Sequence, residues 1–127
     1  MQGKGYKLAH SLTLLDANAI ANLAARPVAI ELHNIIPSTN EYLMNRIREA
    51  STIEEGFTVL AECQTAGRGR RGRQWQSPFG SHVYLSQYRS MDDGLIAASG
   101  LTLAIGIAVL KACNRFAATG VALKWPN

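Results

Sequence analysis

The chain has 127 residues, 47% of them apolar, which fits one folded domain or part of one and excludes a disordered polar chain. Its formal net charge is +4, from 13 Lys and Arg against nine Asp and Glu. The two isolated cysteines, Cys63 and Cys113, indicate neither a zinc site nor a disulfide framework, so we expect both to be reduced in a cytoplasmic protein.

The first third of the chain predicts a short helix, a strand and a longer helix. Asp16 is a suitable N-cap for a helix over residues 17–25, which Pro27 would end. Residues 28–36 are β-branched and apolar and predict a strand, where the main fold begins. The small polar residues 38–40 open a helix that runs to about residue 50 with an apolar stripe.

The remaining elements predict a hairpin, an apolar helix and a last strand. Residues 57–64 form the second strand and residues 83–88 the third, antiparallel to it. Residues 95–117 read as one long helix, apolar all round through residue 110 and therefore covered on most sides. Its uncharged part is shorter than the ~20 residues that a membrane span needs. Residues 121–125 predict a fourth strand.

This order of elements predicts a mixed α+β fold with a largely antiparallel sheet and helices mainly on one face. A chain that ends directly after a strand, at Pro126-Asn127, suggests that a neighbouring strand and a closing element follow in a longer protein.

The stretch that packing explains least is residues 67–75, called here the arginine loop. It holds four arginines, three glycines and Trp75 and contains no carboxylate. The other nine of the 13 basic residues balance the nine acidic ones, so the net charge is that of the loop. Glycines let a backbone approach a ligand, and guanidinium groups match carboxylates and phosphates. We therefore expect a small anionic ligand, and, without it, a loop with few internal contacts and poor order.

Alternatives to an anion-binding loop stay open at this point. The spacing is neither that of a Walker A loop nor that of a dinucleotide fingerprint. A solvated basic loop or an arginine-rich contact to RNA or DNA would have the same composition. Two further stretches favour a ligand site: Ser38-Thr39-Asn40 and Lys124-Trp125-Pro126-Asn127 both stand at strand ends. Helix capping alone would also explain the first of them.

Taken together, these stretches resemble biotin protein ligase in order and spacing. The match runs over residues 28–127, and the arginine loop with its tryptophan is the most diagnostic part. Gly3-Lys4-Gly5-Tyr6 also resembles the exit from the winged helix-turn-helix of the bifunctional ligase/repressor subgroup. The resemblance implies a fold like that of class II aminoacyl-tRNA synthetases and biotin ligases. It also implies ATP-dependent activation of biotin to biotinyl-5′-AMP, Mg²⁺, and transfer to a lysine of the biotin carboxyl carrier protein of acetyl-CoA carboxylase.

The resemblance also implies roles for individual residues. Biotin would be bound by hydrogen-bonding groups, loop backbone and apolar walls at Ser38, Thr39, Gln64, Gly67, Arg68, Trp75, Tyr84 and Ser86. The adenylate and phosphates would be bound by Arg68, Arg70, Arg71, Arg73, Lys124 and Asn127. Arg70, which would retain the activated intermediate, and Lys124 are the expected catalytic residues. No protein metal site is expected, because His10, His33 and His82 stand far apart.

Departures from the family limit these expectations. The family continues beyond the Lys-Trp-Pro-Asn run with an aspartate, a lysine-bearing strand, more sheet and a small β-barrel. We therefore expect a chain truncated at both ends: residues 1–27 as linker and helix after a missing DNA-binding domain, and residues 28–127 as the first part of the catalytic domain. Such a chain would have weak activity or none, would reach DNA only through the missing domain, and would not bind membranes. Homodimerisation, a lipoate ligase-type activity and a non-enzymatic nucleic-acid module stay open.

Overall fold

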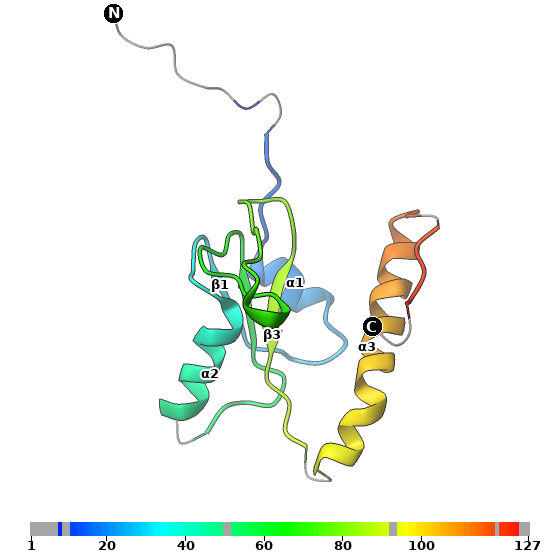
Figure 1. Ribbon diagram of the computed structural model, residues 1–127. Helices are drawn as coiled ribbons and strands as arrows, with labels where there is room; N and C mark the ends of the chain where they lie inside the picture. The colour runs from blue at the N-terminus through cyan, green and yellow to red at the C-terminus, as the bar shows by residue number, and fades with distance from the viewer. Residues whose placement is uncertain (1–7, 9–10, 50–51, 92–93, 119, 125–127) are drawn as a thin grey trace, which may run out of the picture. The chain divides into compact units, whose positions relative to one another are not determined.

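The computed structural model describes residues 8, 11–49, 52–91, 94–118 and 120–124 (Figure 1). The chain divides into two compact units, Met1–Arg89 and Ser90–Asn127, which are described separately below. The predicted division between residues 1–27 and 28–127 stays a prediction.

The first helix, α1, spans Ala17–Leu23 and begins as predicted. The Asp16 carboxylate accepts a hydrogen bond from the Ala19 N–H at 3.0 Å, which satisfies one of the free donors at the start of the helix. Just before this cap, the Leu15 N–H donates to Oε1 of the buried Glu62 at 2.5 Å. The segment that leads into α1 is therefore attached to the end of the second strand.

The first unit contains a three-stranded sheet in the order β1-β2-β3. The strands are β1 (Ile30–His33), β2 (Thr58–Ala61) and β3 (Tyr84–Gln87), and helix α2 (Thr39–Glu49) connects β1 to β2. Strand β1 pairs with β2 in parallel and β3 pairs with β2 antiparallel, as the hairpin prediction required. A helical crossover between neighbouring strands makes the first pair parallel. The mixed α+β fold class is confirmed.

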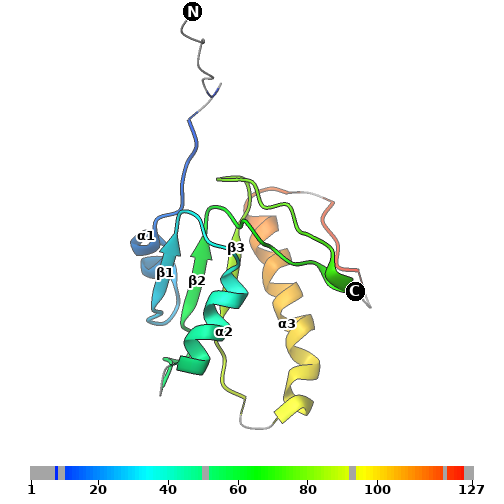
Figure 2. The same ribbon diagram turned by 60° about the vertical axis from the view of Figure 1, so that its left-hand side comes forward.

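The core lies around β2, the central strand. All four of its residues are buried, including Val59 and Leu60 on opposite faces. Ile36, Ala61 and Tyr84 pack together at the end of the sheet from which the arginine loop leaves. Helix α2 packs against β2 and β3 and α1 against β1, and Figure 2 shows α2 in front of the sheet. Contacts with β1, β3 and α2 therefore hold β2, the strand that leads into the arginine loop.

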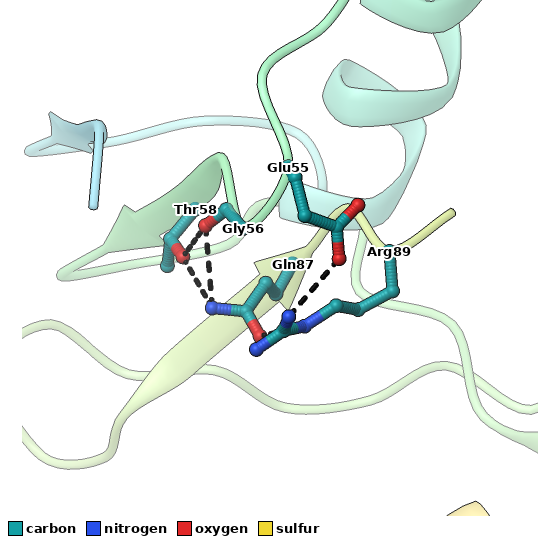
Figure 3. A network of polar contacts seen from close by, with 5 residues as sticks. All are labelled: Glu55, Gly56, Thr58, Gln87 and Arg89. Carbon is teal, nitrogen blue, oxygen red and sulfur yellow. Dashed lines mark hydrogen bonds and ion pairs between the residues drawn. The ribbon is translucent and has the colours of Figure 1, made fainter. Parts of the chain in front are cut away.

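A polar network holds the opposite end of the β2–β3 hairpin (Figure 3). The Gln87 amide donates to Thr58 Oγ1 at 2.9 Å and to the Gly56 carbonyl at 3.3 Å, and the Thr58 hydroxyl donates to the same carbonyl. Arg89 pairs with Glu55 at 3.0 Å. Because Thr58 and Gln87 are register partners, the network fixes how β2 and β3 align.

The second unit consists of α3 (Gly94–Arg115) and the residues after it. The helix matches its predicted range, and Ile105 and Val109 are 54% and 55% exposed. Because the second unit is described by itself, the expected cover of the helix stays a prediction. The predicted fourth strand is wrong for residues 121–124, which pair with no strand among the described residues. Leu123 instead lies beside α3, where a Cβ at Gly106 would come within 3.1 Å of it. Trp125 lies outside the described residues.

No helix in the described part of the chain is long and apolar enough to cross a membrane.

Candidate functional site

A cavity of about 500 Å³ lies where the start of α2, the end of β2, the arginine loop and β3 meet. Main-chain hydrogen bonds join the segment after β1 to the segment after β2: Ile36 N–H to Cys63 O, Thr65 N–H to Ile36 O and Ala66 N–H to Pro37 O. The cavity is lined by Ser38, Thr39, Asn40, Glu41, Met44, Arg48, Gln64, Arg68, Trp75, Tyr84, Leu85 and Ser86. Seven of the eight predicted biotin-binding residues are in this set.

The floor of the cavity is a hydrogen-bonded group of three side chains. Gln64 Oε1 accepts from the Thr39 N–H at 2.8 Å and from the Thr39 hydroxyl at 3.2 Å. The Thr39 hydroxyl also lies 2.9 Å from the Ser86 hydroxyl. Because hydroxyl groups both donate and accept, this floor can exchange its internal bonds for bonds to a ligand carrying both kinds of group.

Ser38 has the capping role that the sequence allowed. Its Oγ accepts from the Glu41 N–H at 3.4 Å in the first turn of α2. The side chain is buried and also lines the cavity, so capping and ligand binding are not exclusive readings of this residue.

The arginine loop folds into a small hairpin of its own. The Trp75 N–H donates to Gly67 O at 2.8 Å, the Gly69 N–H donates to Arg73 O at 2.7 Å, and Arg68 and Gln74 form an antiparallel bridge. Arg71, at the tip, has a left-handed backbone with φ 59° and ψ 36°. The expectation of few internal contacts is therefore wrong, because the backbone groups bond to one another across the hairpin. Poor order without a ligand stays a prediction.

Among the described side chains of the loop, the charges are only weakly compensated. Arg68 Nη2 lies 3.6 Å from Glu41 Oε1, with 76% and 48% of the two side chains exposed. An ion pair this exposed contributes about 0–1 kcal/mol, so an anion in the cavity competes readily with Glu41 for the guanidinium. Arg71 and Arg73 are exposed and do not line the cavity. The backbone of Arg70 is part of the hairpin, and its side chain lies outside the described part of the structure.

Two apolar groups complete the walls. Trp75 lines the cavity while 60% exposed. Tyr84 is buried, and its hydroxyl donates to the Pro78 carbonyl at 2.9 Å and lies 3.2 Å from His82 Nδ1. Because the hydroxyl is held by these contacts, Tyr84 can offer its ring to a ligand in the cavity, which suits an apolar wall.

Several lining residues were not predicted from the sequence. Glu41, Met44 and Arg48 come from α2 at spacings of three and four, which place them on one face of the helix. Asn40 belongs to the stretch 38–40 that the sequence favoured as part of a ligand site, and Leu85 lies between the predicted residues Tyr84 and Ser86. Glu41, Met44 and Arg48 could have been found from the sequence, because the helical period places them on the same face of α2 as the polar residues at its start.

The remaining predicted residues are not brought to the cavity by the described structure. Gly67 is buried at the base of the arginine loop and is not a lining residue. Lys124 belongs to the second unit, and Asn127 lies outside the described residues. In the parts of the chain that are described, no group of three or more His, Cys, Asp or Glu side chains could hold a metal ion.

Comparison with known proteins gives consistent matches. The model of the biotin/lipoate A/B protein ligase family matches residues 32–127. The chain is 45% identical over 131 residues to the bifunctional ligase/repressor BirA of Salmonella typhimurium, covering 98% of this chain and 38% of that protein. It is 40% identical over 94 residues to the biotin–[acetyl-CoA-carboxylase] ligase of Mycobacterium tuberculosis, covering 71% of this chain and 35% of that protein.

Two solved structures resemble the chain at 30% sequence identity. The Aquifex aeolicus biotin protein ligase in complex with biotin and ATP matches with a TM-score of 0.60. This match covers 78% of this chain and 40% of the Aquifex aeolicus chain. The Leishmania major biotin protein ligase in complex with biotinyl-5-AMP matches with a TM-score of 0.57. This match covers 78% of this chain and 45% of the Leishmania major chain. The chain spans less than half the length of these relatives.

Proposed function

Because the chain belongs to the biotin/lipoate A/B protein ligase family, we propose that its cavity binds biotin and that the protein carrying it is a biotin protein ligase. The protein activates biotin with ATP to biotinyl-5′-AMP and transfers biotin to a lysine of a biotin carboxyl carrier protein. The two structural neighbours, which hold biotin with ATP and biotinyl-5-AMP, support this choice of substrates.

The observation that carries the proposal is the floor formed by Thr39, Gln64 and Ser86 beneath the wall of Trp75. The ureido ring of biotin has one carbonyl acceptor and two N–H donors, which match hydroxyl groups that both donate and accept. The fused rings and alkyl tail of biotin suit the apolar surfaces of Trp75 and Tyr84. The carboxylate at the end of the tail then needs cations, and Arg68 of the arginine loop lines the same cavity.

In the first step, a carboxylate oxygen of biotin bonds to the α-phosphorus of ATP while the bond to the β-phosphate oxygen breaks and pyrophosphate leaves. Both reactants are anions, so positioning and charge neutralisation lower the barrier more than covalent help would. Arg68 lies where it can approach the carboxylate after releasing Glu41. Roles for Arg70, Arg71, Arg73, Lys124 and Asn127 at the phosphates remain part of the proposal.

Mg²⁺, the carrier protein and the cellular setting are further parts of the proposal. Mg²⁺ commonly binds through substrate phosphates, one or two carboxylates and water, so it would arrive with ATP and offset phosphate charge. The acceptor is the biotin carboxyl carrier protein of acetyl-CoA carboxylase, an assignment supported by the name of the Mycobacterium tuberculosis relative. The protein acts in the cytoplasm, forms a homodimer, and contacts DNA only through a separate N-terminal domain, as the repressor names of relatives suggest.

Isothermal titration of the protein with biotin, desthiobiotin and lipoate tests the ligand. We expect biotin to bind most tightly, and Thr39→Val to weaken biotin binding about tenfold, because the variant removes the hydroxyl that bonds to Ser86 and to Gln64 and keeps only the backbone bond from residue 39 to Gln64. Thr102→Val, on an exposed part of α3, is the matched control and should bind like the wild type.

Two outcomes would favour other functions. Lipoate binding without biotin binding would move the protein to the lipoate branch, which the family description also includes. Binding of RNA or DNA that falls steeply with salt, without any small ligand, would favour a nucleic-acid module built on the arginine loop.

A further inference from the structure

A second, shallower groove of about 410 Å³ lies beside the cavity. It is lined by Gln64, Thr65, Gln74, Trp75, Gln76, Ser77 and Pro78, and we call it the amide groove. Gln64 and Trp75 line both the cavity and the groove, so these two side chains separate the spaces. A molecule in the groove therefore lies one side chain away from a ligand in the cavity.

Gln64 connects the two spaces through a single amide. Its Oε1 accepts both hydrogen bonds from Thr39, on the cavity side. Its Nε2 donates to Ser77 Oγ at 3.4 Å, on the groove side. The amide is bonded at both ends and stands between the two spaces.

The groove offers hydrogen bonds without charge. No side chain in its lining is ionised, and the arginines of the neighbouring loop do not contribute to it. The side-chain amides of Gln74 and Gln76 are exposed, and no described residue hydrogen-bonds to either of them. A primary amide presents one carbonyl acceptor and two N–H donors, which can pair with the backbone N–H and C=O groups of an extended peptide. Such a groove fits a peptide better than an anion.

Trp75 gives the groove its link to the reaction. Trp75 is 60% exposed. Aromatic faces attract the methylene stem and the cationic head of a lysine. A lysine whose backbone lies in the groove would pass its side chain along the indole toward the cavity.

We propose that the amide groove binds the backbone of the acceptor segment around the target lysine, with Gln74 and Gln76 as its hydrogen-bonding partners. This rests on the proposed biotin transfer. There, the lysine ammonium first loses a proton to solvent, and the neutral nitrogen bonds to the carbonyl carbon of the adenylate. The carbon–oxygen bond to AMP breaks, AMP leaves with the electron pair, and a second amine proton passes to solvent. The two glutamines thus determine acceptor binding and leave adenylate formation alone.

The test separates the two half-reactions in the whole protein with the double substitution Gln74→Ala and Gln76→Ala. Without acceptor, pyrophosphate release on mixing with ATP and biotin should match the wild type, which also shows that the variant is folded. With a carrier domain as acceptor, KM should rise roughly tenfold or more, from two lost hydrogen bonds. With hydroxylamine, a small amine that needs no groove, consumption of the adenylate should be unchanged.

Asn22→Ala, which removes an exposed amide from α1 outside both spaces, is the control and should behave like the wild type. A double variant with normal adenylate formation and a normal KM for the carrier would overturn the groove assignment alone. A wild-type protein that forms no adenylate would overturn the proposed function and this inference with it.

Discussion

Gly67 stands at the base of the arginine loop, where the cavity and the amide groove meet. A Cβ at this position would lie 3.0 Å from Ser77 Oγ, 3.2 Å from the Trp75 carbonyl and 3.3 Å from Gln64 Nε2. The Gln64 amide and the Trp75 backbone are parts of the partition between the two spaces. Gly67 therefore acts through close packing: its missing side chain lets the loop lie directly on the residues that shape the site.

We predict that Gly67→Ala lowers the free energy of unfolding by about 1–3 kcal/mol, the usual cost of overpacking, and weakens biotin binding at least tenfold. The added methyl would push Gln64 away from Thr39. Urea denaturation and calorimetric titration measure the two effects.

Gly100→Ala is the matched control for this substitution. Its Cβ would meet nothing within 4 Å, and it lies within α3, so the variant should gain about 0.5–1 kcal/mol through reduced chain entropy. A Gly67→Ala variant with wild-type stability and affinity would show that the loop base is loosely packed.

Most of the cavity could be predicted at the residue scale, because resemblance fixed the spacing of Ser38, Gln64 and Trp75 along the chain. The ion pair between Arg68 and Glu41 could not be predicted from the sequence. The loop itself has no carboxylate, and Glu41 lies in another element that reaches Arg68 only through the crossover. The side-chain bonds within the floor, such as Thr39 to Ser86, were equally invisible, since they join residues 47 positions apart.

At the scale of elements, α2 joins the sheet through a polar contact as well as apolar packing. The Tyr42 hydroxyl on α2 donates to Glu31 on β1, whose carboxylate also lies 3.0 Å from His33 Nε2. The rings of His33 and Tyr42 meet edge to face with centroids 4.7 Å apart. The hydrogen bond to Glu31 raises the pKa of Tyr42 above the ordinary 10.0, and burial and the charge of Glu31 act in the same direction. Glu49 adds to this rise in pKa and Arg46 opposes it.

This contact predicts a loss of stability in alkali. Because the folded pKa of Tyr42 is higher than the unfolded one, its contribution is complete below pH 10.0 and is lost as the pH rises through the folded pKa. Tyr42→Phe should be less stable at pH 8 by about 1.5–3 kcal/mol, the value of a hydrogen bond to a charged group. The difference from the wild type should shrink above pH 10 in urea titrations.

Tyr88→Phe, at the end of β3, is the control and should keep the alkaline decline that Tyr42 contributes. A constant difference between wild type and Tyr42→Phe from pH 8 to 11 would contradict the assignment.

The elements themselves were largely predictable, because local signals agree with the fold: Asp16 caps α1, β-branched runs form β1 and β2, and α2 begins after small polar residues. The predictions that failed concern the hydrogen-bonding partners of a segment and not its own residue pattern. Residues 121–124 have strand composition, but a strand also needs a hydrogen-bonding neighbour, which no described residue provides. The arginine loop has the composition of an open loop, yet its glycines allow the tight turn that closes it into a hairpin.

At the scale of the whole molecule, the arginine loop and the long apolar helix α3 belong to different units. The arginine loop in the first unit carries an excess of charge equal to the net charge of the chain. The second unit carries α3, in which Leu101, Ile105 and Val109 repeat every four residues and are all exposed. A sequence this apolar predicts cover, and composition cannot show which segment or molecule would provide it.

The exposed stripe of α3 predicts that the 127-residue chain binds an apolar dye such as anilinonaphthalene sulfonate in its folded state. Contiguous apolar surface of this kind is rare on soluble monomers and is a site where such dyes bind. Replacing Ile105 and Val109 together by lysine should cut the dye fluorescence several-fold, because it interrupts the stripe at two successive turns. Asn114→Lys, which adds a charge at an exposed polar position of the same helix, is the control and should change the fluorescence little. Circular dichroism checks that the helix persists in each variant. If the wild-type chain binds no dye, or the double variant binds it equally, then α3 is covered in solution, and the apolar periodicity would have predicted its environment correctly.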